Sequence, residues 1–209
     1  MRSRAATAPE ALAIVFARAP QPGRVKTRLA PLLGARGAAA LHARLVARTM
    51  RVARAACLGE VELHCTPSTA HPFFRRFAER KRLQRGTDLG ERMYRALRRG
   101  LRTHRAVLLV GSDCPALRAV HLKRAARWLR NGADAVLAPT RDGGYALIGL
   151  SRISCELFRN IPWGSDRVMA RTRARLRRLG WRWRELPRLW DVDRPEDVLR
   201  MRRGARVTL

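Results

Sequence analysis

Cationic side chains gather in the Pro- and Gly-containing segment Arg18–Pro31, which follows the apolar run Leu12–Phe16. Backbone amides in such a turn can hold phosphate oxygens, and Lys26 and Arg28 can neutralise the charge of a diphosphate. The glycine spacing fits neither the Walker A pattern GxxxxGK[ST] nor the dinucleotide pattern GxGxxG. This segment predicts a phosphate-binding loop, with an ordinary basic surface loop as the alternative.

A second candidate is Asp113, which lies in the segment Gly111–Pro115 directly after the apolar run Ala106–Val110. In parallel sheets ligands bind beyond the carboxyl ends of the strands, so a carboxylate in this place is suited to hold Mg²⁺ or Mn²⁺. The alternative is that Ser112 and Asp113 cap the helix that follows. The position at a strand end favours the metal ligand.

Three more aspartates occupy positions from which they could join such a site. Asp142 opens the tight-turn signal Asp142–Tyr145, and Asp191 and Asp193 lie on one side of an extended segment near the C-terminus. A divalent ion commonly uses a second carboxylate, and the chain has only 16 acidic residues to supply one. The alternatives are that Asp142 only forms the turn and that Asp193 only caps the last helix.

The charge balance of the chain raises nucleic acid as a candidate partner. The 209 residues carry 45 Lys plus Arg against 16 Asp plus Glu, a formal net charge of +29, and only three of the cations are lysines. Such an excess attracts polyanions in a salt-dependent way. The arginines are spread evenly, however, and no zinc finger, RNP-like strand or basic zipper accompanies them. We interpret them as solvated helix faces that reflect genomic base composition, which leaves only non-specific nucleic-acid binding.

The histidines, the cysteines, Ser112 and the lengths of the apolar stretches argue against hydrolase, zinc-binding and membrane functions. The five histidines never pair as HxxxH and are interpreted as structural, and Ser112 lacks the G-x-S-x-G context of a hydrolase. The four cysteines show no CxxC spacing, which predicts reduced thiols and no zinc site. No apolar stretch approaches the roughly 20 residues that cross a bilayer, and the N-terminus lacks a secretory signal. We therefore expect a cytoplasmic protein without membrane contact.

The elements that must position the candidate residues alternate along the chain, as in a mostly parallel sheet with helices on both faces. The length predicts one domain, residues 1–209, of the α/β class. Thr87 or Asp88 is expected to cap one helix, and Ser165 another. Strands are predicted at Leu12–Phe16, Val61–Cys65, Ala106–Val110, Ala135–Ala138, Ala146–Leu150 and Trp181–Leu186. Helices are predicted at about Ala35–Cys57 and Pro72–Arg80, around 89–101, up to Arg130, up to Leu179 and from Pro195.

The motifs in this order resemble a known family, the bacterial glycosyltransferase-like proteins of the nucleotide-diphospho-sugar transferase superfamily, which include members linked to arsenosugar biosynthesis. The resemblance spans nearly the whole chain and covers Phe16–Leu29, Gln84–Met93, Gly111–Pro115, Asp142–Tyr145 with Leu147–Leu150, Trp163 with Val168, and Asp191–Asp193. It implies a GT-A-like, Rossmann-related three-layer αβα sandwich with a mostly parallel mixed sheet. It also implies relatedness to molybdenum-cofactor and 2-phospholactate nucleotidyltransferases.

The resemblance further implies roles for individual residues. The phosphates of the nucleotide would contact Ala17, Arg18, Pro20, Gly23, Lys26 and Arg28, and the base or ribose would contact Gln84, Gly86 and Asp88. The metal, Mg²⁺ or Mn²⁺, would be held by Asp113 together with Asp191 or Asp193. The acceptor would face Asp142, Gly143, Gly144, Tyr145 and Trp163. Two departures stand out: Arg18 replaces a usual lysine and keeps the charge, whereas Arg194 replaces a usual threonine beside the metal-side loop.

Three functions remain open from the sequence. The first is a metal-dependent glycosyltransferase that moves a sugar from a nucleotide sugar to a small-molecule acceptor, with Lys26, Asp113 and Asp142 as catalytic residues. In it Asp142 would be the base that receives the proton of the acceptor hydroxyl. The alternative is a nucleotidyltransferase that releases pyrophosphate from a nucleoside triphosphate. The third is a non-catalytic nucleic-acid-binding or regulatory protein, and a homodimer is compatible with each.

Overall fold

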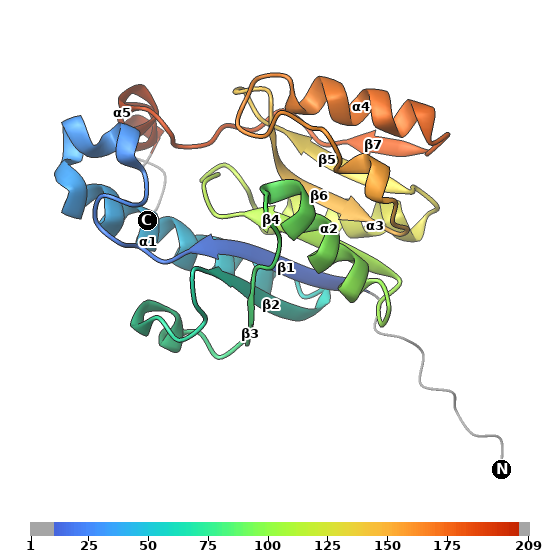
Figure 1. The fold of residues 1–209 in the computed structure, drawn as a ribbon, viewed down its shortest axis with the longest axis horizontal. Helices are drawn as coiled ribbons and strands as arrows, with labels where there is room; N and C mark the ends of the chain where they lie inside the picture. The colour runs from blue at the N-terminus through green and yellow to red at the C-terminus, as the bar shows by residue number, and fades with distance from the viewer. Residues whose placement is uncertain (1–10, 205–209) are drawn as a thin grey trace, which may run out of the picture.

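The computed structural model describes residues 11–204, which form a seven-stranded sheet with helices against both of its faces (Figure 1). The order of the strands in the sheet is β3-β2-β1-β4-β6-β5-β7. The strands are β1 (Ala11–Arg18), β2 (Gly59–Thr66), β3 (Arg80–Leu83), β4 (Ala106–Gly111), β5 (Ala135–Pro139), β6 (Tyr145–Leu150) and β7 (Trp183–Glu185). The α-helices are α1 (Ala30–Ala55), α2 (Leu89–Gly100), α3 (Ala119–Arg130), α4 (Val168–Arg178) and α5 (Pro195–Gly204). Three 3₁₀ helices are η1 (Thr27–Leu29), η2 (Pro72–Arg76) and η3 (Cys155–Leu157).

The strand directions bring the ends of β1 and β4 together. Strands β3, β2, β1 and β4 run parallel, β6 runs antiparallel to β4 and β5, and β7 runs parallel to β5. Ala11 pairs with Ala106 and Phe16 pairs with Gly111, so β1 and β4 end side by side. The chain leaves β1 toward β2 on one side, while β4 lies on the other. Open α/β sheets bind ligands at such a switch point.

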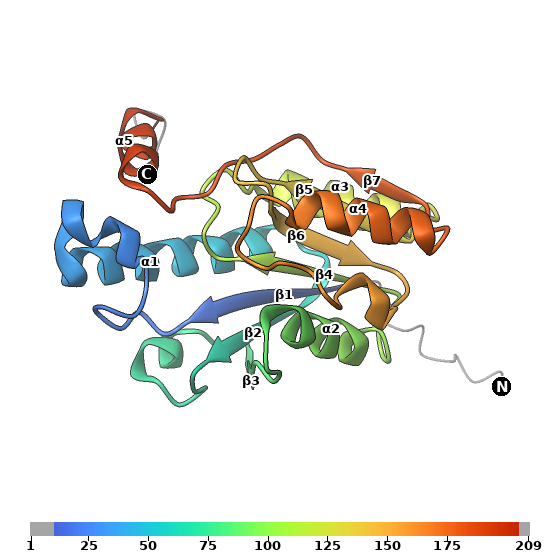
Figure 2. The ribbon, with the colours of Figure 1, turned by 45° about the horizontal axis from the view of Figure 1, so that its top comes forward.

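Side chains alternate along β1 and divide the helices between the two faces of the sheet. Val15 belongs to a core cluster that includes residues of α1 and α3. The neighbouring Ile14 belongs to a second cluster with residues of α2 and α4. Figure 2 shows α1 above β1 and α2 below it. Because helices cover both faces of β1, its side chains are apolar on either side, and the strand is a continuous apolar run.

A third, smaller cluster holds the C-terminal part of the described chain against the first loop. It contains Leu29 from η1, residues of α1, Val192, and Val198 from α5. Because Leu29 and Val192 are both fully buried in it, the segment before α5 is fixed beside the loop that follows β1. Residues 166 positions apart therefore come within bonding distance, as Lys26 and Val192 do.

The structure corrects two expectations about elements. The helix expected to reach Arg80 ends at Arg76, and Arg80–Leu83 forms β3, which pairs in parallel with β2. This strand is cationic because it lies at the sheet edge, so it lacks the apolar pattern by which strands are predicted. The long part of α1 begins after a kink at Gly34, as expected, and a short helical stretch from Ala30 precedes the kink. Ser165 accepts a bond from Arg167 N in the turn ahead of α4 and does not cap that helix.

Within residues 11–204, no helix combines the length and the apolar character that crossing a membrane requires.

Candidate functional site

The loops that follow β1 and β4 meet through an ion pair. Lys26 Nζ lies 3.0 Å from Asp113 Oδ1 and donates a hydrogen bond of 2.6 Å to the carbonyl oxygen of Val192. The Lys26 side chain is only 4% exposed, whereas that of Asp113 is 49% exposed. The basic loop and the aspartate singled out in the sequence thus lie in direct contact. The ammonium already has two protein partners, which the sequence does not reveal.

The backbone of the first loop aims Lys26 at this contact. Lys26 has left-handed dihedral angles (φ 49°, ψ 40°), a conformation that costs a non-glycine residue roughly 1–2 kcal/mol. Gly23, with φ 74°, turns the chain three residues earlier. A left-handed backbone conformation at a non-glycine residue persists only where the surrounding structure enforces it, and such residues are frequent at functional sites. Here Lys26 reaches inward while the loop carries Arg24 and Arg28 on its exposed side.

Other residues predicted in the first loop are held by their backbone. The Ala17 carbonyl accepts a 3.3 Å bond from Gln84 Nε2, and the Arg18 carbonyl accepts a 2.9 Å bond from His42 Nε2. Pro20 lies between Ala19, whose amide donates to Thr66 O, and Gln21, whose amide donates to Ala19 O. Arg28 turns away from Lys26 and binds Asp193 Oδ2 at 2.6 Å.

Asp113 is not a helix cap, because α3 begins at Ala119 with Arg118 as its N-cap residue. Its Oδ1 atom is buried, so the exposed half of the side chain is the remainder of the carboxyl group. Burial raises the pKa of Asp113, but His42 and Lys26 outweigh burial and hold that pKa below its ordinary value. The carboxylate is therefore ionised at neutral pH and presents one oxygen outward, as a metal ligand requires.

His42 is a site residue that the sequence did not indicate. Its Nδ1 atom lies 3.7 Å from Asp113 Oδ1, and its ring is anchored by the bond to Arg18 O. The residue comes from the buried side of α1, 24 positions after Arg18. A single histidine on a helix that is mostly Ala, Leu and Arg carries no spacing signal, so only the tertiary arrangement reveals it.

Asp191 and Asp142 add negative charge beside Asp113. The amide of Val192 donates a 2.9 Å bond to Asp113 O and so places the segment 191–193 against the loop after β4. Burial and the negative charges of Asp142 and Asp113 raise the pKa of Asp191 to about 6, although the positive charge of Lys26 acts in the opposite direction. Carboxylates that disfavour one another's ionisation suit a cation. Asp193 instead pairs with Arg28, and it does not cap α5, since Asp197 accepts the Asp193 and Arg194 amides.

The fit of a divalent ion to these residues is partial. Within residues 11–204, no group of three or more His, Cys, Asp or Glu side chains is arranged closely enough to hold a metal ion. The outward oxygen of Asp113 and the carboxyl group of Asp191 are the donors that a divalent ion would use, with water or phosphate oxygens completing its shell. Oxygen donors of this kind match Mg²⁺ or Mn²⁺ and not zinc.

Asp142, Gly143 and Gly144, predicted to face the acceptor, form the tight turn between β5 and β6, and Trp163 lies in the segment before α4. Thr140 Oγ1 and Gly144 N both donate to Asp142 Oδ1, so Asp142 does form the turn, and within residues 11–204 no hydrogen bond reaches its Oδ2. Gly143 (φ 84°) lies against the backbone of Asp166, and its carbonyl accepts from Met169 N at 2.8 Å. Tyr145 meets the ring of Trp163 edge to face, with centroids 6.3 Å apart.

The segment predicted to lie against the base is tied to the ends of β1 and β2. Gln84 Nε2 donates to His64 O at 2.8 Å as well as to Ala17 O. Gly86 has φ 146°, and a Cβ there would come within 2.8 Å of Arg92 N. Asp88 caps α2 by accepting a 2.8 Å bond from Glu91 N, which decides between Thr87 and Asp88. The side chains of Gln84 and Asp88 therefore have structural partners already.

A sequence profile of one protein family, described as an uncharacterized protein conserved in bacteria (DUF2064), matches residues 49–165. That range exceeds half of the 209 residues and contains Asp113 and Asp142. Lys26, His42 and Asp191 lie outside it. No curated protein matches the chain.

Solved structures share the fold over nearly the whole chain. A candidate nucleotide-diphospho-sugar transferase from Desulfovibrio desulfuricans G20 is 29% identical, with a TM-score of 0.87 over 95% of this chain and 88% of its own. A CMP:2-keto-3-deoxy-manno-octonic acid synthetase in complex with CTP is 14% identical, with a TM-score of 0.61 and coverage of 96% and 100%. Rv0371C from Mycobacterium tuberculosis H37Rv, in complex with manganese, is 19% identical, with a TM-score of 0.58 and coverage of 93% and 98%. The expected GT-A-like fold is confirmed.

Proposed function

This chain belongs to the bacterial family DUF2064. We propose that it is a metal-dependent glycosyltransferase that uses a nucleotide-sugar donor. The carrying observation is the contact between Lys26 and Asp113 at the neighbouring ends of β1 and β4. It puts a cation and a carboxylate where a switch point of the sheet would take up phosphates. The similarity to the Desulfovibrio desulfuricans protein supports a nucleotide-sugar donor.

Each residue of the site has a part in this proposal. Asp113 and Asp191 hold the divalent ion, which supplies positive charge to the departing diphosphate. Lys26 keeps Val192 and Asp113 in place before the donor arrives and then contacts the phosphates together with Arg28, so both cations exchange a protein partner for phosphate oxygens. The solved manganese complex of a protein with the same fold supports the choice of metal.

The acceptor would lie over the turn that carries Asp142. One carboxylate oxygen of Asp142 is fixed by Thr140 and Gly144, which leaves Oδ2 to receive the proton of an acceptor hydroxyl. A base in this role must come within about 3 Å of that hydroxyl. Tyr145 and Trp163 form the aromatic wall next to it. The acceptor is therefore proposed to be a small molecule with a hydroxyl group.

Nucleotidyl transfer is the second candidate, because the chain shares its fold with a synthetase solved in complex with CTP. In that reaction the same cations would stabilise charge on the α-phosphate, and pyrophosphate would leave a nucleoside triphosphate. The two reactions release different products from different donors, so products distinguish them.

The test incubates the protein and Mn²⁺ with separate panels of nucleotide sugars and nucleoside triphosphates, and measures nucleoside diphosphate and pyrophosphate. We expect nucleoside diphosphate from a nucleotide sugar, and an Asp113→Asn variant should lose at least about 100-fold in rate while staying folded. Glu60→Gln, at an exposed carboxylate near the start of β2 and at the opposite end of the sheet from Asp113, is the control and should keep the rate. Pyrophosphate release would instead favour nucleotidyl transfer, and full activity of Asp113→Asn would remove Asp113 from the mechanism.

A further inference from the structure

A cavity of about 400 Å³ lies between β3 and α2, and neither Lys26 nor Asp113 lines it. Two of its lining residues, Gln84 and Arg85, belong to the segment 84–88 that is predicted to lie against the base or ribose. The cavity wall is cationic and contains Lys81, Arg82, Arg85, Arg92, Arg95 and Arg99. The proposed function uses none of these six cations.

Helical and strand geometry bring the cations to one place. Arg92, Arg95 and Arg99 stand at positions i, i+3 and i+7 of α2, which is the spacing of one helix face. The edge strand β3 and the turn after it supply Arg82 and Arg85 from the opposite wall. The stripe on the helix therefore faces the cationic edge strand across the cavity.

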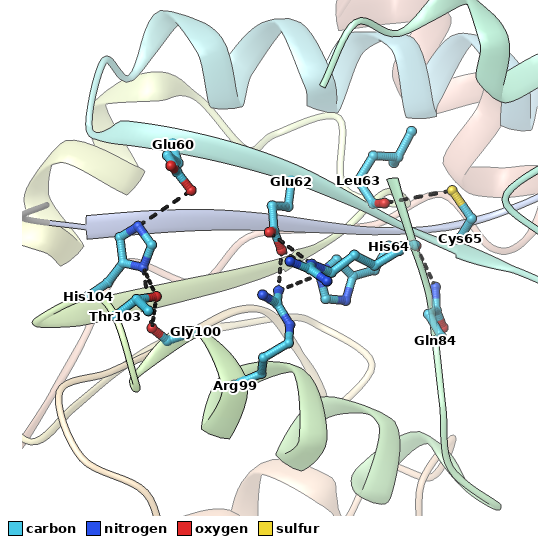
Figure 3. A network of polar contacts seen from close by, with 11 residues as sticks. Glu60, Glu62, Leu63, His64, Cys65, Gln84, Arg99, Gly100, Thr103 and His104 are labelled. Atoms are coloured by element: carbon cyan, nitrogen blue, oxygen red, sulfur yellow. Dashed lines mark hydrogen bonds and ion pairs between the residues drawn. The ribbon is translucent and has the colours of Figure 1, made fainter. Parts of the chain in front are cut away.

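One buried carboxylate fixes two of the guanidinium groups at the inner end of the cavity. Glu62, on β2, is 2% exposed. Its Oε1 accepts a 2.9 Å bond from Arg82 Nε. Its Oε2 accepts from both Arg99 NH2 and His64 Nε2 (Figure 3). The side chains of Arg82 and Arg99 are 28% and 34% exposed, so most of each is covered by protein. A single negative charge thus holds two positive charges that still reach the cavity.

The charge of the cavity does not depend on a titration near neutral pH. Burial raises the pKa of Glu62, but bonds from His64 and Arg82 and the charge of Arg99 bring it down to about 2. Burial lowers the pKa of His64, which adds no positive charge at neutral pH. Glu91 pairs with Arg95, and Lys81 donates to the carbonyl oxygens of Phe77 and Glu79. The remaining guanidinium groups stay protonated at any physiological pH.

We propose that this cavity binds a small polyphosphate anion, such as inorganic tripolyphosphate or the phosphate chain of a nucleotide. Guanidinium groups are planar forks that bind phosphate oxygens in pairs, and Arg82 and Arg99 are held in place before the ligand arrives. A volume of about 400 Å³ accommodates a small ligand and not a duplex. Arg92 donates to Gly86 O, so the bound anion lies directly behind the segment predicted to contact the base or ribose.

The partial burial of Arg82 and Arg99 distinguishes this cavity from the basic surface of the rest of the chain. An arginine on a solvated helix face keeps its head group in water, as exposed Arg98 does. Two guanidinium groups that share one buried carboxylate are instead withdrawn from solvent, which strengthens their attraction for an anion.

The test measures binding of tripolyphosphate by calorimetry in the absence of metal. Because removal of Arg82 or Arg99 would strip a partner from buried Glu62 and endanger folding, the variant is Arg85→Ala/Arg95→Ala, at two exposed residues of the wall. Its matched control is Arg98→Ala/Arg102→Ala, which removes the same charge from exposed positions outside the cavity. We expect at least about a tenfold loss of affinity in the first variant and less than about threefold in the control. Equal losses in both would overturn the proposal, since net charge would then explain the binding.

Tripolyphosphate could also bind beside Lys26, so both double variants are repeated in a Lys26→Ala background. The cavity is separate from that site, and we expect the Arg85→Ala/Arg95→Ala pair to cause the same fold loss in either background. If the loss disappears when Lys26 is absent, the anion binds only at the β1 loop and the cavity is not a site.

Measuring the binding of duplex DNA to the same variants distinguishes a site for a small anion from a surface for a nucleic acid. We expect the two double variants to weaken DNA binding equally, because a duplex contacts the surface charge as a whole. A selective loss of DNA binding in Arg85→Ala/Arg95→Ala, with tripolyphosphate binding unchanged, would contradict the proposal and identify a nucleic-acid surface.

Discussion

At the scale of single residues, Lys26 links the fold to the proposed chemistry. A lysine with three donors can satisfy both a backbone carbonyl and a carboxylate and still donate once more. Lys26 donates to Val192 O and forms an ion pair with Asp113 Oδ1. Without a ligand it therefore acts as a fixed cation that neutralises Asp113. Its left-handed backbone holds this position, and an ordinary surface loop would not need it.

We predict that Lys26→Ala weakens binding of nucleoside diphosphates by about tenfold or more but leaves the affinity for the parent nucleosides within about threefold. The reason is that the ammonium contacts phosphate and not the base. Calorimetric titration of nucleoside and diphosphate pairs measures the difference. Arg24→Ala, at an exposed cation of the same loop, should reduce the diphosphate affinity much less. Equal losses for nucleoside and diphosphate would mean that Lys26 only supports the loop.

The residues found by sequence are those whose type and place at a strand end were informative. Lys26 and Asp113 follow apolar runs, and parallel strands end at the same edge, so their proximity could be anticipated. His42 could not be anticipated, because its contact with Asp113 depends on how α1 packs. The partner of Arg28, Asp193, was equally hidden, since side-chain pairing across the fold leaves no local pattern in the sequence. The turn at Asp142 could be anticipated, because its partners Thr140 and Gly144 are two residues away.

At the scale of elements, the buried strands and the edge strand β7 were predicted, whereas the edge strand β3 was missed. β1 and β4 lie at the centre of the sheet and are continuous apolar runs. The edge strand β3 reads Arg-Lys-Arg-Leu, because charges at an open edge discourage pairing with another chain. The same charges that hid β3 from the sequence pattern also form one wall of the cationic cavity.

Turns position the acceptor side of the site, and Gly143 is the critical residue there. We predict that Gly143→Ala lowers the free energy of unfolding by more than about 3 kcal/mol. Its φ of 84° disfavours any side chain, and a Cβ would collide with the backbone of Asp166. Urea denaturation measures the loss of stability. The transfer rate of the Gly143→Ala variant should fall by more than the decrease in the folded fraction explains.

Gly180→Ala is the matched control for Gly143→Ala. Gly180 has φ 62° and no atom within 4 Å of an added Cβ, so it isolates the cost of the backbone conformation, about 1–2 kcal/mol. The difference between the two variants then measures the collision at Asp166. Losses of the same size would show that the turn moves aside freely and that Asp142 is not rigidly placed.

At the scale of the whole molecule, the net charge of +29 is separate from the proposed chemistry. Arginines lie on most exposed faces, including α4 and the edge strand β7, while the functional carboxylates are few and close to the ends of β1 and β4. Six of the cations line one cavity, and Lys26 and Arg28 lie in one loop. The remaining excess gives the molecule a long-range attraction for any polyanion.

This attraction predicts non-specific binding of nucleic acid that is removed by salt. If about 6–10 phosphates are neutralised, affinity for duplex DNA should fall roughly 10³- to 10⁵-fold between 50 and 200 mM salt, and duplexes of different sequence should bind equally. Nucleoside diphosphates, with one or two contacts of this kind, should lose affinity far less over the same range. Fluorescence anisotropy with two unrelated duplexes and one labelled nucleotide measures all three. Sequence preference at high salt, without nucleotide binding, would identify a nucleic-acid-binding protein and would contradict the transferase, because the two functions place the decisive phosphate contacts on different surfaces.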